Sequence, residues 1–171
     1  MPIPNSVAKL SSLFRKLGAT NPERWAASQV EEDIPQLHRY LFLRQAWRRI
    51  IAEDDLKWID AYIRHSESRP SEPYAGIGLA LKRCLDNGAA PEDLTEIVRV
   101  MQAELLSGFA YMLEDPDIRD PDVRDLCWAL FAVDEDGKPF AHIGGLHESV
   151  LETDPTGREM RPKGWKQRQG D

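Results

Sequence analysis

Apolar side chains recur every three or four residues over roughly the first 112 positions of the chain, and this spacing is typical of helices with one buried face. Residues that start or end helices interrupt the pattern at Gly18, Asn21-Pro22, Pro35 and Asn87-Gly88. A mainly β fold would need alternation with a period of two, which this region lacks. The sequence therefore predicts helices near 7–17, 22–34, 36–51, 56–63, 74–85 and 91–112.

The helical pattern breaks in the segment 128–148, where two apolar runs flank Asp136-Gly137. An Asp-Gly pair between such runs favours a two-residue type I′ turn. We therefore expect a β-hairpin near 128–143.

In the register that this turn sets, Phe131 lies opposite His142, and Val133 lies opposite Phe140. Residues 121–133 also fit helical spacing, so the point where helix gives way to strand stays open. The predicted fold class is mainly α (α+β), a helical bundle-like single domain with a C-terminal β-hairpin.

The chain has 171 residues, which suits one domain, because a chain of this length can bury a sizeable core. We predict a single mostly helical domain over 1–153, followed by a polar, basic C-terminal tail over 154–171. Two prolines and three serines make 66–73 the clearest internal linker.

Acidic residues outnumber basic ones, and the net charge is −7. Non-specific nucleic-acid binding relies on a basic surface, so this charge argues against it. The N-terminus has no secretion signal and the apolar runs are short, which argues against export and against membrane insertion. Cys84 and Cys127 lie within apolar patterns and are expected to be buried free thiols. A cytoplasmic protein is the resulting expectation.

Two histidines lie on either side of a glycine pair near the C-terminus. His142 and His147, with the neighbouring Glu148, are candidates for ligand binding or acid/base chemistry, since glycines let a ligand approach the backbone. Arg44 and Arg48, in a cluster that also contains Arg39 and Arg49, could bind a carboxylate or a phosphate through their planar guanidinium groups. The alternative for both sets is structural: hydrogen-bonding histidines at a flexible corner, and a solvated basic helix face.

No segment carries a motif that fixes a reaction. The helix-like segment 147–151 lacks the second histidine of a zinc-protease motif. A calcium loop centred on Gly137 would have apolar residues at both ends. The glycine patterns of nucleophile elbows and nucleotide-binding loops are absent too. We predict no metal and no cofactor, and catalysis stays open.

Two hypotheses for function follow. The favoured one is a small acidic cytoplasmic protein-interaction module, which could neutralise a basic protein partner through charge complementarity. The alternative is an enzyme or a small-ligand or metal-binding protein, with a pocket between the hairpin and the helices. The expected partner is another protein, and a homo-oligomer stays open.

Overall fold

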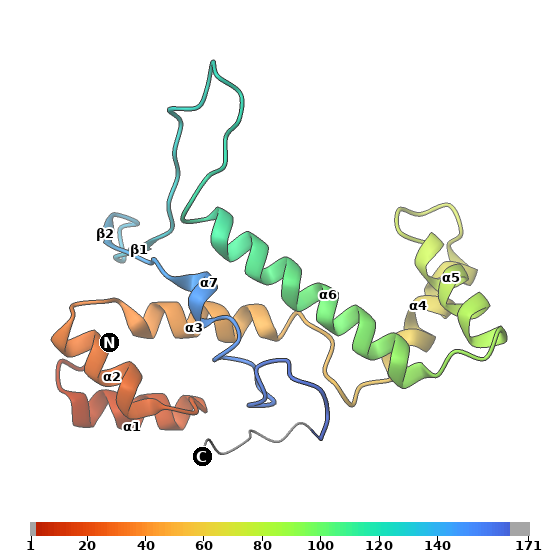
Figure 1. The fold of residues 1–171 in the computed structure, drawn as a ribbon, viewed down its shortest axis with the longest axis horizontal. Helices are drawn as coiled ribbons and strands as arrows, with labels where there is room; N and C mark the ends of the chain where they lie inside the picture. The colour runs from red at the N-terminus through yellow and green to blue at the C-terminus, as the bar shows by residue number, and fades with distance from the viewer. Residues whose placement is uncertain (1–2, 165–171) are drawn as a thin grey trace, which may run out of the picture. The chain divides into compact units, whose positions relative to one another are not determined.

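The structure of the protein is a computed structural model that describes residues 3–164. Within that range the chain forms seven helices and one two-stranded antiparallel sheet, which confirms the predicted mainly α (α+β) fold class (Figure 1). No helix in the described range is both long and apolar enough to cross a membrane. The elements in chain order are α1 (Val7–Leu17), α2 (Pro22–Glu31), α3 (Gln36–Trp47), α4 (Lys57–Ser68), α5 (Gly76–Asp86), α6 (Pro91–Met112), β1 (Phe131–Val133), β2 (Pro139–His142) and α7 (Leu146–Ser149).

The chain divides into two compact units. Unit 1 comprises Met1–Trp47 and Leu105–Asp171, and unit 2 comprises Arg48–Glu104. Helix α6 contributes residues to both units. Whether 1–153 folds as one cooperative domain is a question for unfolding measurements, and the single-domain statement stays a prediction.

An aromatic core joins α1, α2 and α3 in unit 1. Helices α1 and α2 lie side by side (Figure 1). Phe14, Trp25 and Tyr40 meet with ring centroids 5.5 to 5.9 Å apart, in tilted and edge-on geometries that favour aromatic pairs. Leu10 and Phe14 are fully buried. Gly18 ends α1 with a φ of 90°, which its lack of a Cβ permits.

The short helix α7 packs on α3 in the same unit. Leu146 and Val150 are fully buried, and the Trp47 indole N–H donates to the Val150 carbonyl oxygen at 3.0 Å. After α7 the buried Asp154 carboxylate accepts backbone N–H groups of Thr156 and Met160, so residues 154–160 form a tight turn. Residues 165–171 of the predicted tail lie outside the described residues.

Unit 2 is built on α4, α5 and the N-terminal part of α6. Its core contains Trp58 and Ile59 of α4 and Leu81 of α5. The Trp58 indole N–H donates to the Thr95 hydroxyl of α6 at 3.0 Å, which satisfies the polar end of a buried ring.

The ends of α3 and α4 differ from the predicted boundaries, and side-chain hydrogen bonds account for both differences. Helix α3 ends at Trp47, because Gln102 and Arg99 of α6 bind the backbone N–H and carbonyl of Ile51. Helix α4 continues into the predicted 66–73 linker, because its Ser66 hydroxyl is buried and accepts the Gly78 N–H.

The hairpin forms, but its turn differs from the predicted one. Phe131 pairs with His142 as expected, whereas Val133 pairs with Pro139 and not with Phe140. The turn has three residues, because the Asp134 N–H donates to the Lys138 carbonyl. Gly137 takes a φ of 78°, which is typical of a three-residue turn with a bulge. Residues 121–130, which fitted both helix and strand, form turns and irregular chain.

The apolar spacing of the sequence predicted more burial than the structure shows, both for the two cysteines and for α6. Cys84 and Cys127 are both exposed, which contradicts the prediction of buried thiols, since Cys84 lies on the outer face of α5 and Cys127 in the irregular segment before β1. The apolar stripe predicted for α6 is also largely exposed. The described part of the chain does not cover that helix face.

Candidate functional site

A buried arginine that the sequence placed on a solvated helix flank lies at the centre of the candidate site. Arg39 of α3 is only 6% exposed. Its Nη2 donates to the Glu148 carboxylate at 3.2 Å, and its buried Nε–H has no hydrogen-bond partner among the described residues. The guanidinium lies against the backbone of Gly145, where any Cβ would overlap it. Gly145 therefore makes room for Arg39.

A carboxylate and an imidazole form a pair beside this arginine. One oxygen of Glu114 accepts the Gly145 N–H, and the other contacts Nδ1 of His147. The His147 ring also makes an edge-on contact with Tyr111, at a centroid distance of 5.1 Å. A carboxylate on Nδ1 fixes the ring orientation and directs the proton to that nitrogen, so Nε2 is left as the acceptor. His147 Nε2 could therefore accept a proton from a ligand, or the Glu114 and His147 pair could serve only to hold the two segments together.

The predicted site residues take different positions in the structure. His147 and Glu148 lie in the Arg39 and Glu114 cluster, through the contacts above. His142 is exposed, yet its ring reaches the same corner: a Cβ on Gly144 would lie 3.1 Å from His142 Cε1 and 3.0 Å from Glu114 Oε1. The structure therefore brings both histidines close to Glu114.

The two predicted arginines lie elsewhere. Arg44 is half-buried on α3, where its charge acts on Tyr40. Burial raises the Tyr40 pKa, and the nearby Arg44 partly opposes that rise. Arg48 is exposed and belongs to unit 2. Arg39, not either of these, takes the position of an anion-binding group beside His147 and Glu148.

A cavity of about 430 Å³ lies between the hairpin and helices α2 and α3. The residues lining it include Phe140 and Ala141 of β2 and His38 of α3, but none of the predicted site residues. The His38 ring contacts Phe140 at 5.7 Å, and its Nδ1 is buried without a hydrogen-bond partner in the described structure. Burial lowers the pKa of His38, since desolvation disfavours the charged form.

Sequence reasoning missed Gln36, His38 and Glu114, and it placed Arg39 only within the arginine cluster whose structural alternative is a solvated helix face. Gln36, His38 and Arg39 belong to the one helix α3, and the pattern of polar residues there does not show which of them is buried. Glu114 follows α6 in a segment with several other acids, and nothing in the sequence separates it from them.

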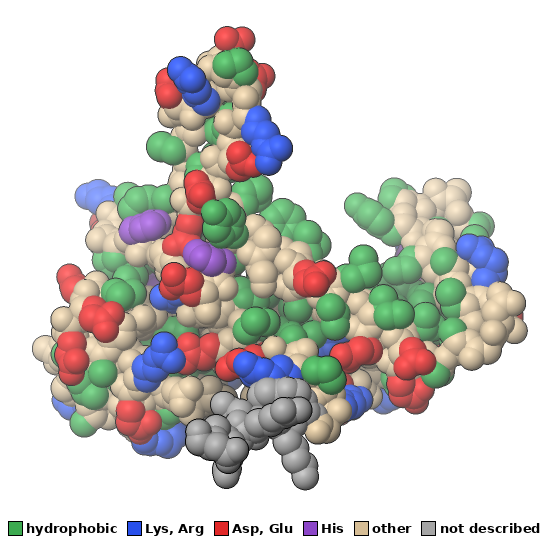
Figure 2. Space-filling model, in the orientation of Figure 1, with side chains coloured by type: hydrophobic (Ala, Val, Ile, Leu, Met, Phe, Trp, Pro, Cys, Tyr) green, Lys and Arg blue, Asp and Glu red, His purple; other side chains and the backbone are tan. Residues whose placement is uncertain are grey.

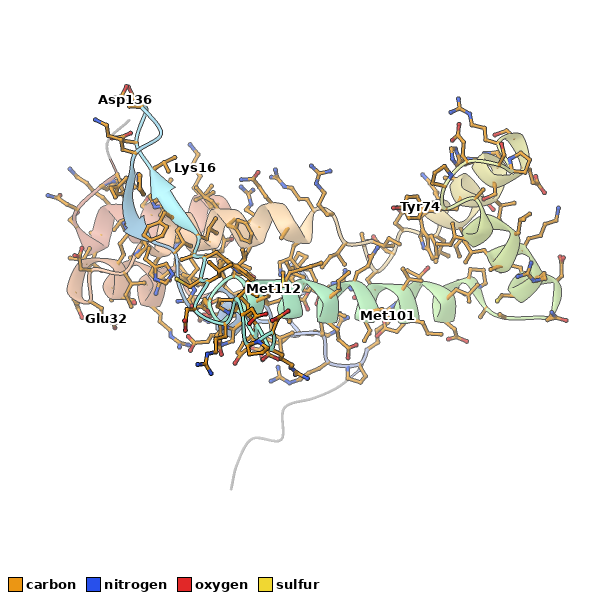
Figure 3. The ribbon with its side chains drawn as sticks, turned by 90° about the horizontal axis from the view of Figure 1, so that it is seen from above. Lys16, Glu32, Tyr74, Met101, Met112 and Asp136 are labelled. Atoms are coloured by element: carbon orange, nitrogen blue, oxygen red, sulfur yellow. The ribbon has the colours of Figure 1, made fainter. Side chains whose placement is uncertain are left out.

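An exposed apolar stripe covers the C-terminal end of α6. Leu105, Phe109 and Met112 recur on one helix face, and the Trp128 indole N–H donates to the Met112 carbonyl oxygen at 2.8 Å, which places the Trp128 ring at the C-terminal end of α6. All four side chains are at least 42% exposed. We call these four residues the apolar stripe. Figure 2 shows hydrophobic side chains gathered along this part of α6, and Figure 3 marks Met112 at its end.

An acidic loop follows the apolar stripe. Residues 114–125 contain six carboxylates and two arginines, and most of these side chains are exposed. One of the arginines, Arg119, is already paired with Asp117 at 2.7 Å. A further acidic group, Asp136, lies at the tip of the hairpin (Figure 3). The chain that directly follows the apolar stripe therefore carries an excess of exposed negative charge.

In the described range, no group of three or more histidine, cysteine, aspartate or glutamate side chains has the geometry to hold a metal ion. Comparisons with protein-family models, with curated proteins and with solved structures found no match to this chain. Functional conclusions therefore rest on the geometry of its own residues.

Proposed function

We propose that this chain is an acidic protein-interaction module whose apolar stripe binds a basic protein partner. The observation that carries the proposal is the uncovered stripe of Leu105, Phe109, Met112 and Trp128 next to the acidic 114–125 loop. A contiguous apolar surface costs solubility when it faces water, so proteins usually keep such a surface for a partner.

The stripe has the composition of an interface centre. Aromatic residues and methionine are enriched at the centres of protein interfaces, and the stripe contains two aromatic residues, Phe109 and Trp128, and one methionine, Met112. They stand on one helix and on a segment hydrogen-bonded to it, so the surface is ordered before a partner binds.

The acidic loop defines the charge of the partner. Carboxylates around an apolar centre attract a partner with basic residues and repel an acidic one, which affects both association rate and specificity. Covering the functional surface of a basic protein in this way would neutralise it.

The test compares the wild-type chain with a Leu105→Ser/Phe109→Ser double variant in pull-downs from a native lysate of the source cells. We expect the wild type to capture one stoichiometric basic protein at low salt, with at least about tenfold less capture by the double variant. Leu79→Ser on α5, which removes another exposed leucine outside the stripe, is the control and keeps the capture.

Three outcomes contradict the proposal. The captured protein could be acidic, or the double variant could retain it. The purified chain could also form a dimer that the double variant dissolves, which light scattering would show. That last result would make the stripe an interface between copies of this chain.

A second candidate function rests on the Glu114 and His147 pair. A carboxylate that orients an imidazole is the arrangement of a general base, with Nε2 as the proton acceptor. An enzyme or small-ligand site would then use His147 with His142 nearby. Substituting both histidines by glutamine would abolish binding of the ligand under this function, and unchanged binding would exclude them.

A further inference from the structure

Gly108 lies inside α6, between residues of the apolar stripe, and nothing in the described part of the chain requires glycine there. Glycine is a poor helix former, so its presence inside a helix usually has a packing or functional reason. The backbone gives no such reason, because Gly108 does not take the positive φ that favours glycine. Packing gives none either: nothing lies within 4 Å of the position that its Cβ would take, whereas a Cβ on Gly78 of α5 would overlap atoms of α4. The space above Gly108 is therefore open.

Three exposed apolar side chains surround this open space. Leu105, Phe109 and Met112 are 59%, 52% and 42% exposed. Together with Gly108 they stand at positions i, i+3, i+4 and i+7 of one helix, which are the four positions that form a hole for a side chain of a facing helix. Ala110, on the opposite side of α6, is only 1% exposed, so the hole faces away from the buried side of the helix. We call Leu105, Gly108, Phe109 and Met112, which all belong to unit 1, the α6 hole.

The geometry of the α6 hole favours a helix as the element that binds it. An extended peptide binds by adding a strand to an open sheet edge, through main-chain hydrogen bonds. A helix face has no such edge, because the backbone N–H and carbonyl groups inside a helix bond to each other. A second helix instead binds through side chains at the same i, i+3, i+4 and i+7 spacing, and one of these side chains enters the hole. Since Gly108 adds no side chain, the α6 hole has room for a large one.

The charge near one end of the α6 hole indicates the charge of that second helix. Asp115 lies three residues beyond Met112 and is exposed, and the 114–125 loop contains six carboxylates but only two arginines. The carbonyl groups at the C-terminal end of α6 add partial negative charge. Lysine and arginine side chains are attracted to this end, whereas a second copy of this chain, with its net charge of −7, is repelled.

We propose that the α6 hole receives a leucine, methionine or phenylalanine side chain from an amphipathic helix of the protein partner, and that basic residues of this helix lie near Trp128. Trp128 marks the correct end, because its indole N–H donates to the Met112 carbonyl oxygen at the C-terminal end of α6. The inference rests on the proposed function and names the structural element that the partner supplies.

The test measures binding of the full chain to three synthetic peptides of about 18 residues by fluorescence anisotropy. The first peptide has leucines at helical spacing and lysines on its other face. The second has the same composition with the leucines at every second position, and the third has glutamates in place of the lysines. We expect the first peptide to bind with a Kd below about 100 μM, and the other two to bind at least about tenfold more weakly.

Variants of the glycine locate the binding. Gly108→Leu fills the α6 hole and should weaken binding of the first peptide at least about tenfold. Leucine is the better helix former, so the melting temperature of this variant should not fall, which separates lost binding from unfolding. Gly108→Ala fills less of the hole and should weaken binding less. Gln45→Leu, which adds a leucine at an exposed position of α3, is the control and leaves binding unchanged.

The outcomes separate this inference from the proposed function. If Leu105→Ser/Phe109→Ser loses a basic protein that Gly108→Leu still captures, the proposed function stands and insertion into the α6 hole is wrong. If the wild type captures no basic protein, the proposed function fails, and the inference fails with it. Equal binding of the first two peptides shows that no helix is required and overturns the inference. A dimer of this chain that Gly108→Leu dissolves overturns it as well, because the helix in the hole would then come from a second copy.

Discussion

At the scale of single residues, glycines decide where polar groups can approach the backbone. Gly145 takes a φ of 65° and lies against Arg39, while Gly157 takes a φ of 69° with open space around it. The two positions share a left-handed backbone but differ in crowding. Comparing them separates conformational strain from steric overlap.

Gly145→Ala should lower the free energy of unfolding more than Gly157→Ala does. The left-handed backbone alone costs an alanine about 1–2 kcal/mol at either position. At Gly145 the new Cβ also displaces the Arg39 guanidinium, which adds to that cost. Urea unfolding followed by circular dichroism measures both. Equal losses would show that Arg39 moves aside without penalty.

His38 should make stability depend on pH. Burial lowers its pKa in the folded chain below the ordinary 6.5, so the unfolded chain binds the proton more readily. The free energy of unfolding therefore falls as the pH drops through about 6.5, and it levels off below the folded pKa. Urea unfolding at several pH values measures the slope. His38→Gln should flatten this slope, because it removes the titrating group.

At the scale of elements, close packing of α4 and α5 depends on the absence of one side chain. A Cβ on Gly78 would overlap the Ser66 hydroxyl and the Tyr62 carbonyl oxygen, both on α4. Glycine at this position therefore permits close packing of the two helices, although glycine has a low intrinsic helix propensity.

Gly78→Ala should destabilise the protein by about 1–3 kcal/mol, since the added methyl group forces α4 and α5 apart. Gly108→Ala is the control, because that glycine lies inside α6 with nothing near its Cβ position. It should instead stabilise the chain by about 0.5–1 kcal/mol through helix propensity. Thermal unfolding of each variant shows whether its stability falls or rises relative to the wild type. A stabilising Gly78→Ala would mean that the two helices do not pack as closely as described.

At the scale of the whole molecule, two compact units share one continuous helix. Unit 2 has its own core around Trp58, and unit 1 has its core around Trp25. Since α6 supplies residues to both units, fraying of this helix in one unit removes support from the other.

Unfolding should therefore be a single cooperative transition, in agreement with the predicted single domain over 1–153. The measurement is urea unfolding of Trp58→Phe and Trp25→Phe variants, each followed by fluorescence and by circular dichroism. If the fluorescence and circular dichroism curves of each variant coincide, the chain unfolds as one domain. Separate midpoints within one variant would show that units 1 and 2 unfold independently.

The sequence by itself determined the local elements. Helix α1 begins and ends as predicted, because Gly18 supplies the left-handed cap, and α2 and α6 begin at prolines whose fixed φ suits a first helical turn. The Asp-Gly pair located the hairpin, although the extra turn residue that shifted its register depends on Asp134 side-chain bonds to the backbone. These are local effects within a few residues, which periodicity and turn chemistry can report.

Only the tertiary structure decided what these elements face. Glu114 contacts His147 from 33 positions away, and Arg39 contacts Glu148 from 109 positions away, so no local pattern indicates either pair. The same limit explains why Arg39 was expected in solvent and why the α6 stripe was expected in a core. Spacing shows that one helix face is apolar or polar, but burial depends on which distant segment packs on that face, and this is set by the whole chain.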